Sequence, residues 1–433
     1  MTPQSNVMVL APVREGRAPE LRQFLATMNR SPGVVDPDNG LVPFGQLDTA
    51  HFVRFVVLED VTPNDIVPFG VPPEHYPIYL AFMADFDGER DTFVAKLVQI
   101  ATNGLRQIFS FCEGFNQNTD LRWWMEAYSV PIATNYVNWV GRTSLQVGEE
   151  AALHTALISY VAQNATALSD KPPQQIHQQL REFVRSEQQA GRLPLTPDPA
   201  TPLGWQIRNI GHFLGVLLVL LLVSPFLLLY LPFFLIILRH HEKHDPQVSF
   251  RINLDHADQL ARIEDLDVTN QFTVMGSLKP GWFPRTTLVF LLWLVNYTAQ
   301  HLYTRGRLAR ISTIHFARWV FMDNKKRLVF ASNYDASLEA YMDDFINKVG
   351  FGLNLVFGVG VGYPRTRFLI FGGSQDEQPF KYVLRRHQLP TDVWYNAHPG
   401  LTALDRHRNT LIREGLEKNS LSDSEARQWL QLI

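Results

Sequence analysis

The chain has 433 residues, of which 46% are hydrophobic, and its 39 lysines and arginines nearly balance its 42 aspartates and glutamates. This length and composition indicate a folded chain of two or three domains. The formal net charge of −3 argues against extensive nucleic-acid binding. The single cysteine, Cys112, excludes an internal disulfide and a thiolate metal cluster. The soluble parts therefore suit a reducing compartment, and no metal is expected.

Residues 1–148 are predicted to form a first folded unit of mixed strands and helices. No signal-peptide pattern opens it. Hydrophobic periodicity predicts strand, helix, strand, strand, helix and strand over 6–13, 16–29, 50–58, 78–86, 89–102 and 106–115. This β-α-β-β-α-β order is that of a ferredoxin-like unit.

Residues 149–200 are predicted to be an insert. Its helices are expected at 149–168 and 173–191, and a proline-rich linker starts at residue 192. The insert leads directly to a far more apolar part of the chain.

Residues 205–245 are predicted to attach the chain to a membrane. Residues 211–238 carry no charge, and about 18 such residues already indicate membrane insertion. Trp205 before this stretch and RHHEKH (239–244) after it are typical of interfacial anchors. Ser224 and Pro225 lie near its middle, so the segment is either a single span or a helical hairpin turning at this proline.

The form of this segment decides where the rest of the chain lies. A single span would put the parts before and after it on opposite sides of the membrane. A hairpin, or a helix lying in one leaflet, would keep both parts on one side, which we predict. Basic flanks place that side in the cytoplasm, at a bacterial inner membrane; they are Arg208, Arg239, Lys243 and Arg251.

Residues 265–410 are predicted to form a second unit with the same element order. Its strands and helices are expected at 271–278, 284–303, 311–322, 327–334, 338–350 and 353–363. The helix 284–303 contains an unbroken apolar run, 288–295, which is typical either of a buried helix or of one touching the bilayer surface. Residues 411–433 are predicted to be a helical tail.

The two units match each other in sequence. The stretch DTAHFVRFVVLE (48–59) matches STIHFARWVFMD (312–323), and further matches follow in the same order: Asp87 with Asp335, Tyr136 with Tyr395 and Thr143 with Thr402. Collinear matches indicate an internal duplication.

The duplicated element order resembles the dimeric α/β-barrel superfamily, in the form of an uncharacterised bacterial membrane-attached family. This resemblance implies an α+β fold in which two ferredoxin-like repeats pair by their bare sheet faces into a pseudo-dimeric barrel, interrupted by the helical and membrane insert.

The shared motif supplies the first candidate site residues. Side chains alternate along a strand, so either the pair His51 and His315 or the pair Arg54 and Arg318 is expected to face the interior. Two arginines could hold an anionic group, whereas structural roles for both pairs remain an alternative. The carboxylates Asp87 and Asp335 are expected to cap the helices that follow them.

Three further residues are candidates outside the duplicated motif. Arg365 and Arg367 are two apart on an expected strand and could hold a carboxylate or phosphate. His398 lies in a turn where the first repeat has Trp139, and such a unique histidine is a candidate axial ligand.

The sequence supports a membrane-attached protein that binds a small apolar or lipid-derived ligand, with no reaction assigned. The alternative is a haem-dependent oxidoreductase, because haem peroxidases and monooxygenases occur on the fold it resembles; haem would then be the cofactor. A third hypothesis is a scaffold filled by its own side chains. The expected partners are a lipid membrane and a small apolar ligand, and a homo-oligomer is possible.

Overall fold

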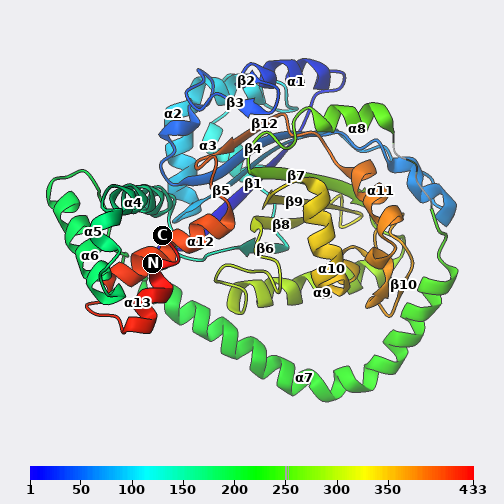
Figure 1. Cartoon of the computed structure of the whole chain (residues 1–433). Helices are drawn as coiled ribbons and strands as arrows, with labels where there is room; N and C mark the ends of the chain where they lie inside the picture. Colours follow the sequence, from blue (N-terminus) through cyan, green and yellow to red (C-terminus); the bar gives the residue numbers. More distant parts are fainter. Residues whose placement is uncertain (249–250, 252) are drawn as a thin grey trace.

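The computed structural model describes residues 1–248, 251 and 253–433. Its centre is a pair of four-stranded antiparallel sheets with helices, an α+β architecture (Figure 1). Sheet 1 has the order β1 (Gln4–Pro12), β5 (Tyr79–Asp87), β4 (Ala50–Leu58), β12 (Val393–Asn396). Sheet 2 has the order β6 (Thr134–Val137), β8 (Ile314–Met322), β9 (Arg327–Asp335), β7 (Thr269–Ser277).

The two repeats exchange an edge strand. β12 comes from the second repeat but pairs with β4 of the first, with Tyr395 opposite Val53. Reciprocally, β6 comes from the first repeat and pairs with β8 of the second, with Tyr136 opposite Ala317. Each sheet is therefore completed by the other repeat, and a membrane cannot separate the two repeats in this structure.

Two expected strands are wrong. Only the first residues of 106–115 and 353–363 continue a helix, namely the last turns of α2 (Arg90–Phe109) and α10 (Leu338–Phe357). The remaining residues form turns, with isolated bridges at Cys112 and Gly360. Short apolar runs do not separate a strand from a buried helix end, and here the apolar residues extend the buried stripe of each helix. The fourth strand of each sheet is instead the exchanged β6 or β12.

Helices cover one face of each sheet. On sheet 1, α1 (Ala18–Ala26), α2 and α3 (Leu121–Ala127) close a hydrophobic core. On sheet 2, α9 (Trp282–His301), α10 and α11 (Glu377–His387) do the same. A further cluster joins residues of both sheets, so their other faces contact each other. Shorter elements are α8 (Leu254–Ala261) and the two-stranded pairs β2 (Asn29–Ser31) with β3 (Val34–Val35) and β10 (Thr366–Arg367) with β11 (Phe371–Gly372).

The insert and the C-terminal tail pack into one helical unit. It consists of α4 (Ser144–Gln163), α5 (Ala165–Leu168), α6 (Pro173–Gln189), α12 (Ala403–Glu417) and α13 (Asp423–Leu430). The pseudo-equivalent helices α4 and α12 each follow an exchanged strand. Each begins with a capping box, at Thr143 and at Thr402.

The apolar segment is one continuous helix, α7 (Leu203–His244), and no turn forms at Ser224 and Pro225. Pro225 cannot donate to the carbonyl of Leu221, and the Ser224 hydroxyl donates to that carbonyl instead, at 2.7 Å. This bond satisfies the carbonyl that Pro225 leaves without its helical donor.

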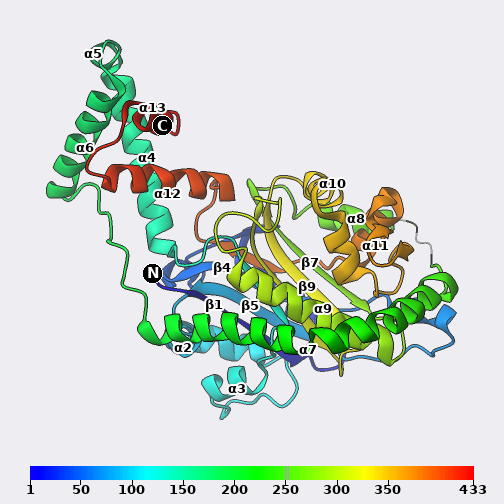
Figure 2. The same cartoon turned by 90° about the horizontal axis from the view of Figure 1, so that it is seen from below.

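Both ends of α7 are held against the same folded body, and its middle is exposed. Near its start, the Tyr297 hydroxyl donates to the carbonyl of Phe213 at 2.9 Å. Near its end, Phe234 and Leu238 pack with Phe283 of α9. The helix forms an arc beside α9 (Figures 1 and 2). Within the described residues, it is the one helix long and apolar enough to cross a membrane.

Candidate functional site

The duplicated histidines lie buried between the ends of the two sheets. His51 Nε2 is 2.8 Å from Asp87 Oδ1, and His315 Nε2 is 2.6 Å from Asp335 Oδ1. Burial lowers the pKa of His315, although Asp335 opposes this shift, so His315 is neutral at pH 7 and donates to Asp335. Each repeat thus carries the same histidine–carboxylate pair.

The second carboxylate oxygen of each aspartate accepts a hydrogen bond from the first residue of a helix that lies far away in the sequence. Asp87 Oδ2 accepts the backbone N–H of Ser144, and Asp335 Oδ2 accepts that of Ala403, each at 2.7 Å. The prediction that these aspartates cap α2 and α10 is wrong, because Glu89 and Ser337 occupy those N-cap positions. The aspartates instead join the strand ends of both sheets to α4 and α12.

A β-bulge in each strand changes the expected alternation. The register of β4 shifts between Ala50 and Phe52, and that of β8 shifts at the equivalent place. A bulge places neighbouring residues on one side of a strand. His315 consequently contacts Phe52 of sheet 1, with ring centroids 5.4 Å apart. Arg54 of β4 likewise reaches sheet 2. The histidine and the arginine of the motif therefore both face the other sheet, and they do not lie on opposite faces of their strand as expected.

The paired arginines bind the opposite sheet. Arg54 donates to the carbonyls of Phe272 and Ser332, at 3.1 and 3.0 Å, and to the side chain of Asn333. Burial, with the like charge of Arg318, lowers the pKa of Arg54 to about 9, so it stays cationic at pH 7. These contacts give the guanidinium a structural role.

The pseudo-equivalent Arg318 makes the reciprocal contacts with sheet 1. It donates to the carbonyls of Val7 and Ala84, at 3.0 and 3.3 Å, and to the carboxylate of Asp85. Asp85 and Asn333 are equivalent in the duplication. Two arginines therefore face one carboxylate, which makes the centre of the molecule electrostatically asymmetric.

A small cavity of about 40 Å³ lies beside the histidine pair. Its walls include His51, His315 and Arg406, and its volume corresponds to one or two water molecules. Among the described residues, Arg406 Nε and Nη2 and His51 Nδ1 have no hydrogen-bond partner. Arg406 also lies over the Phe52 ring, at 5.3 Å. Sequence reasoning missed Arg406 because its helix, α12, has the charged pattern of a solvent-facing tail.

His398 lies near this cavity but does not line it. Its Nε2 is 2.9 Å from Ser144 Oγ. Burial, followed by the positive charge of Arg406, lowers the pKa of His398 to about 3, so its imidazole is neutral. A neutral imidazole can bind iron, but Ser144 engages this nitrogen and the adjacent 40 Å³ cavity is far too small for a porphyrin. The residues here do not fit a haem.

Arg365 and Arg367 lie apart from the other candidates. Both are exposed, Arg365 just before β10 and Arg367 within it. The hairpin formed by β10 and β11 packs on the C-terminal end of α7 rather than on the histidine pair. The seven predicted site residues therefore fall into two groups: a buried polar cluster between the sheets, and this exposed pair.

A strongly apolar pocket lies on the helix-covered face of sheet 2. It measures about 260 Å³ and is enclosed by β-strand residues such as Phe272 and Trp319 together with α9 and α10. Its α10 wall includes Val349, Gly352 and Val356. This pocket could not be predicted from the sequence, because its lining residues are those of an ordinary core.

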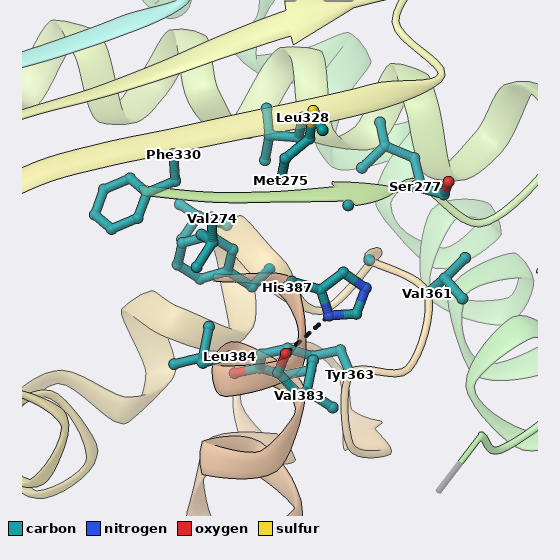
Figure 3. A pocket seen from close by; sticks show the side chains of 15 residues that line it. Val274, Met275, Ser277, Leu328, Phe330, Val361, Tyr363, Val383, Leu384 and His387 are labelled. Carbon is teal, nitrogen blue, oxygen red and sulfur yellow. Dashed lines mark hydrogen bonds between the residues drawn. The ribbon is translucent and has the colours of Figure 1, made fainter. Parts of the chain in front are cut away.

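A smaller pocket of about 60 Å³ adjoins it, and both share Phe330 and Leu384 as walls. Figure 3 shows His387 at this pocket, with its Nδ1 donating to the carbonyl of Val383 at 2.8 Å. Burial lowers the pKa of His387, so it is neutral at pH 7. His387 and Ser277 add polar side chains to this mainly apolar pocket.

Comparison with protein-family models, with curated proteins and with solved structures finds no match. The resemblance to the dimeric α/β-barrel superfamily therefore rests on the element order and the duplication.

Proposed function

We propose that this protein is attached to a membrane and binds the apolar part of a small lipid-derived ligand in the pocket on sheet 2. The observation that carries the proposal is the position of that 260 Å³ pocket. It is enclosed by α9 and α10, and α9 is also the helix against which both ends of α7 are held.

The properties of α7 support attachment to a membrane. Its central residues, such as Leu222, Phe226 and Leu229, are 65–74% exposed. Exposing an apolar surface on every side of a helix to water is energetically unfavourable, whereas the hydrocarbon of a bilayer solvates such a surface well. Because both ends of α7 contact one body, we assign it to an arc within one leaflet, with its ends at the headgroups.

The two helices that line the pocket carry other exposed apolar side chains. Phe290 and Trp293 of α9 are 47% and 37% exposed, and Phe351 of α10 is 54% exposed. Phe351 also lines the pocket. A lipid tail could therefore pass between α9 and α10 without crossing a polar surface.

The pocket has a suitable size and lining for such a tail. An apolar cavity of about 150 Å³ holds benzene, and ligand pockets usually begin at about 300 Å³. A pocket of about 260 Å³ suits a short acyl chain or an isoprenoid unit. Together with the neighbouring His387, it offers an apolar body and one polar wall.

The remaining parts of the proposal concern assembly and location. The contacting sheet faces and the exchanged strands support a pseudo-dimeric α/β barrel formed by two ferredoxin-like repeats. The basic residues at both ends of α7 support the cytoplasmic face of a bacterial inner membrane, with both repeats on that side.

Filling the pocket tests ligand binding. A Cβ added at Gly352 would meet only Val349 Cβ, at 3.9 Å, so Gly352→Leu places its side chain at the pocket wall without a backbone clash. We expect solvent extraction and mass spectrometry to find a lipid bound to the purified wild-type protein, at least about fivefold depleted in Gly352→Leu.

Gly352→Ala is the matched control. Alanine stabilises the helix by about 1 kcal/mol relative to glycine, and leucine does so by nearly as much. Unlike leucine, alanine leaves most of the pocket open. The alanine variant should retain the lipid. Equal retention by the wild type and both variants would show that the extracted lipid lies elsewhere and would contradict the proposed pocket.

A further inference from the structure

The turn that joins β10 and β11 exposes apolar side chains beside α7. Residues 365–371, called the 365–371 hairpin below, include Phe368, Ile370 and Phe371, which are 38%, 48% and 48% exposed. A soluble loop tip rarely carries three such residues within four positions. The tip therefore has the composition of a surface that meets an apolar phase.

Arginines surround these apolar side chains. Arg365 and Arg367 are exposed, and the Arg367 guanidinium lies 4.9 Å from the centre of the Phe371 ring. Arg239 of α7 lies 5.0 Å from the centre of the Phe368 ring. Arginine stacked on an aromatic ring keeps its charge outward while the ring enters the apolar phase. The last turn of α7 adds exposed His240, Lys243 and His244.

The hairpin is fixed to the end of α7 by one buried carboxylate. Glu242 accepts hydrogen bonds from the backbone N–H groups of Phe368 and Leu369, both at 2.9 Å, and from the Thr366 hydroxyl at 2.8 Å. Phe368 and Leu369 have left-handed backbones, with φ of 58° and 55°. This conformation is costly for such residues, and Glu242 holds it. The exposed tip is thus a positioned structure.

From these contacts we infer that the 365–371 hairpin is a second membrane-contacting element, which binds the headgroups of acidic phospholipids in the bilayer that holds α7. Arg365 and Arg367 contact the lipid phosphates, while Phe368, Ile370 and Phe371 enter the headgroup–acyl boundary. The inference rests on the proposed membrane attachment of α7, and it adds the lipid class that the surface recognises.

The charges around the hairpin agree with this partner. Glu242 is buried and paired with Arg239, so its negative charge does not face outward. The hairpin's own exposed charged side chains, Arg365 and Arg367, are both positively charged. Each arginine near an acidic membrane surface strengthens binding about 5.5-fold, so the pair contributes roughly 30-fold.

A fluorescent probe on the hairpin tests the inference in the full-length protein. A thiol-reactive dye is attached to Ile370→Cys, and the protein is placed in vesicles of phosphatidylcholine alone or with phosphatidylglycerol. Burial raises the pKa of the native Cys112 to about 12, so the introduced thiol is the one that reacts. Spin-labelled lipids then quench dyes that touch the bilayer.

We expect strong quenching at residue 370 in vesicles with phosphatidylglycerol and much less in phosphatidylcholine alone. The double change Arg365→Gln and Arg367→Gln should weaken docking of the hairpin on acidic vesicles about 30-fold. A dye on Ile158→Cys, exposed on α4, should remain unquenched in both.

A dye on Leu222→Cys, in the middle of α7, separates the two proposals. Quenching at residue 222 without quenching at residue 370 would overturn the hairpin inference and leave membrane attachment intact. Equal quenching at residue 370 in vesicles with and without phosphatidylglycerol would overturn the assignment to acidic headgroups. An unquenched residue 222 would overturn the membrane attachment itself.

Discussion

The asymmetric centre of the molecule makes a strong prediction about two equivalent arginines. Arg318 is paired with Asp85, which is 3% exposed, whereas Arg54 is paired with the neutral Asn333. Replacing Arg318 by methionine leaves a buried carboxylate without its ion-pair partner, which costs about 3–5 kcal/mol. Replacing Arg54 by methionine removes hydrogen bonds but also a like charge, so we expect a cost of only about 1–3 kcal/mol.

A second change tests this reasoning against a simple loss of packing. Adding Asp85→Asn to Arg318→Met removes the stranded charge and should restore about 1–3 kcal/mol of unfolding free energy. The same Asp85→Asn change in the wild-type background should destabilise the protein. The assay is denaturant unfolding in mild detergent, followed by tryptophan fluorescence. Equal costs for the two arginine variants, or no recovery in the double variant, would refute the electrostatic account.

Other predictions concern pH, the hairpin and the exchanged strands. The pKa of His398 is about 3, below its ordinary value of 6.5, so the unfolded chain takes up a proton first on acidification. Stability should fall below pH 6.5, by at most about 2.7 kcal/mol at pH 4.5, and His398→Gln should remove this part of the loss in pH-dependent unfolding. Glu242→Gln should speed amide hydrogen exchange of the 365–371 hairpin at least about tenfold; unchanged exchange would contradict its role as a clamp. Cysteines at Val53 and Tyr395 should form a disulfide, whereas cysteines at Ala317 and Tyr395 should not; the opposite result would mean that the strands are not exchanged.

Much of the fold could be predicted from local patterns. The strands β1, β4, β5, β7, β8 and β9 lie close to their predicted ranges, and so do α9 and α6, whereas α4 begins and ends five residues earlier than predicted. Each has a period set by its own side chains, which is why a local pattern identifies it. The duplication was equally readable, and it correctly indicated two sheets of similar order.

The strand exchange could not be predicted in this way. Tyr136 and Tyr395 are equivalent, and the residues opposite them, Ala317 and Val53, are equivalent too. The residues of either edge strand can therefore pair equally well with either sheet. Which sheet receives it depends on the connections and on the packing of α4 against α12, which are properties of the whole chain.

The candidate site was predicted only in part. The sequence singled out the histidine and arginine pairs but not their common orientation, because the bulges that produce it leave no mark in the alternation of residue types. It also gave no sign of Arg406, whose burial depends on how α12 packs. The apolar pocket could not be predicted from the sequence, because a core with a cavity and a fully packed core have the same amino-acid composition.

Photochemical labelling tests the central claim most directly. A fatty acid with a photoreactive tail is added to membranes containing the full-length protein, and the labelled peptides are mapped by mass spectrometry. We predict labels on residues of α9 and α10 that line the pocket, such as Leu294, Phe345 and Val349, in addition to labels on α7. Labels confined to α7 would show a helix in contact with lipid beside a pocket that lipid does not enter, and would contradict the proposed function.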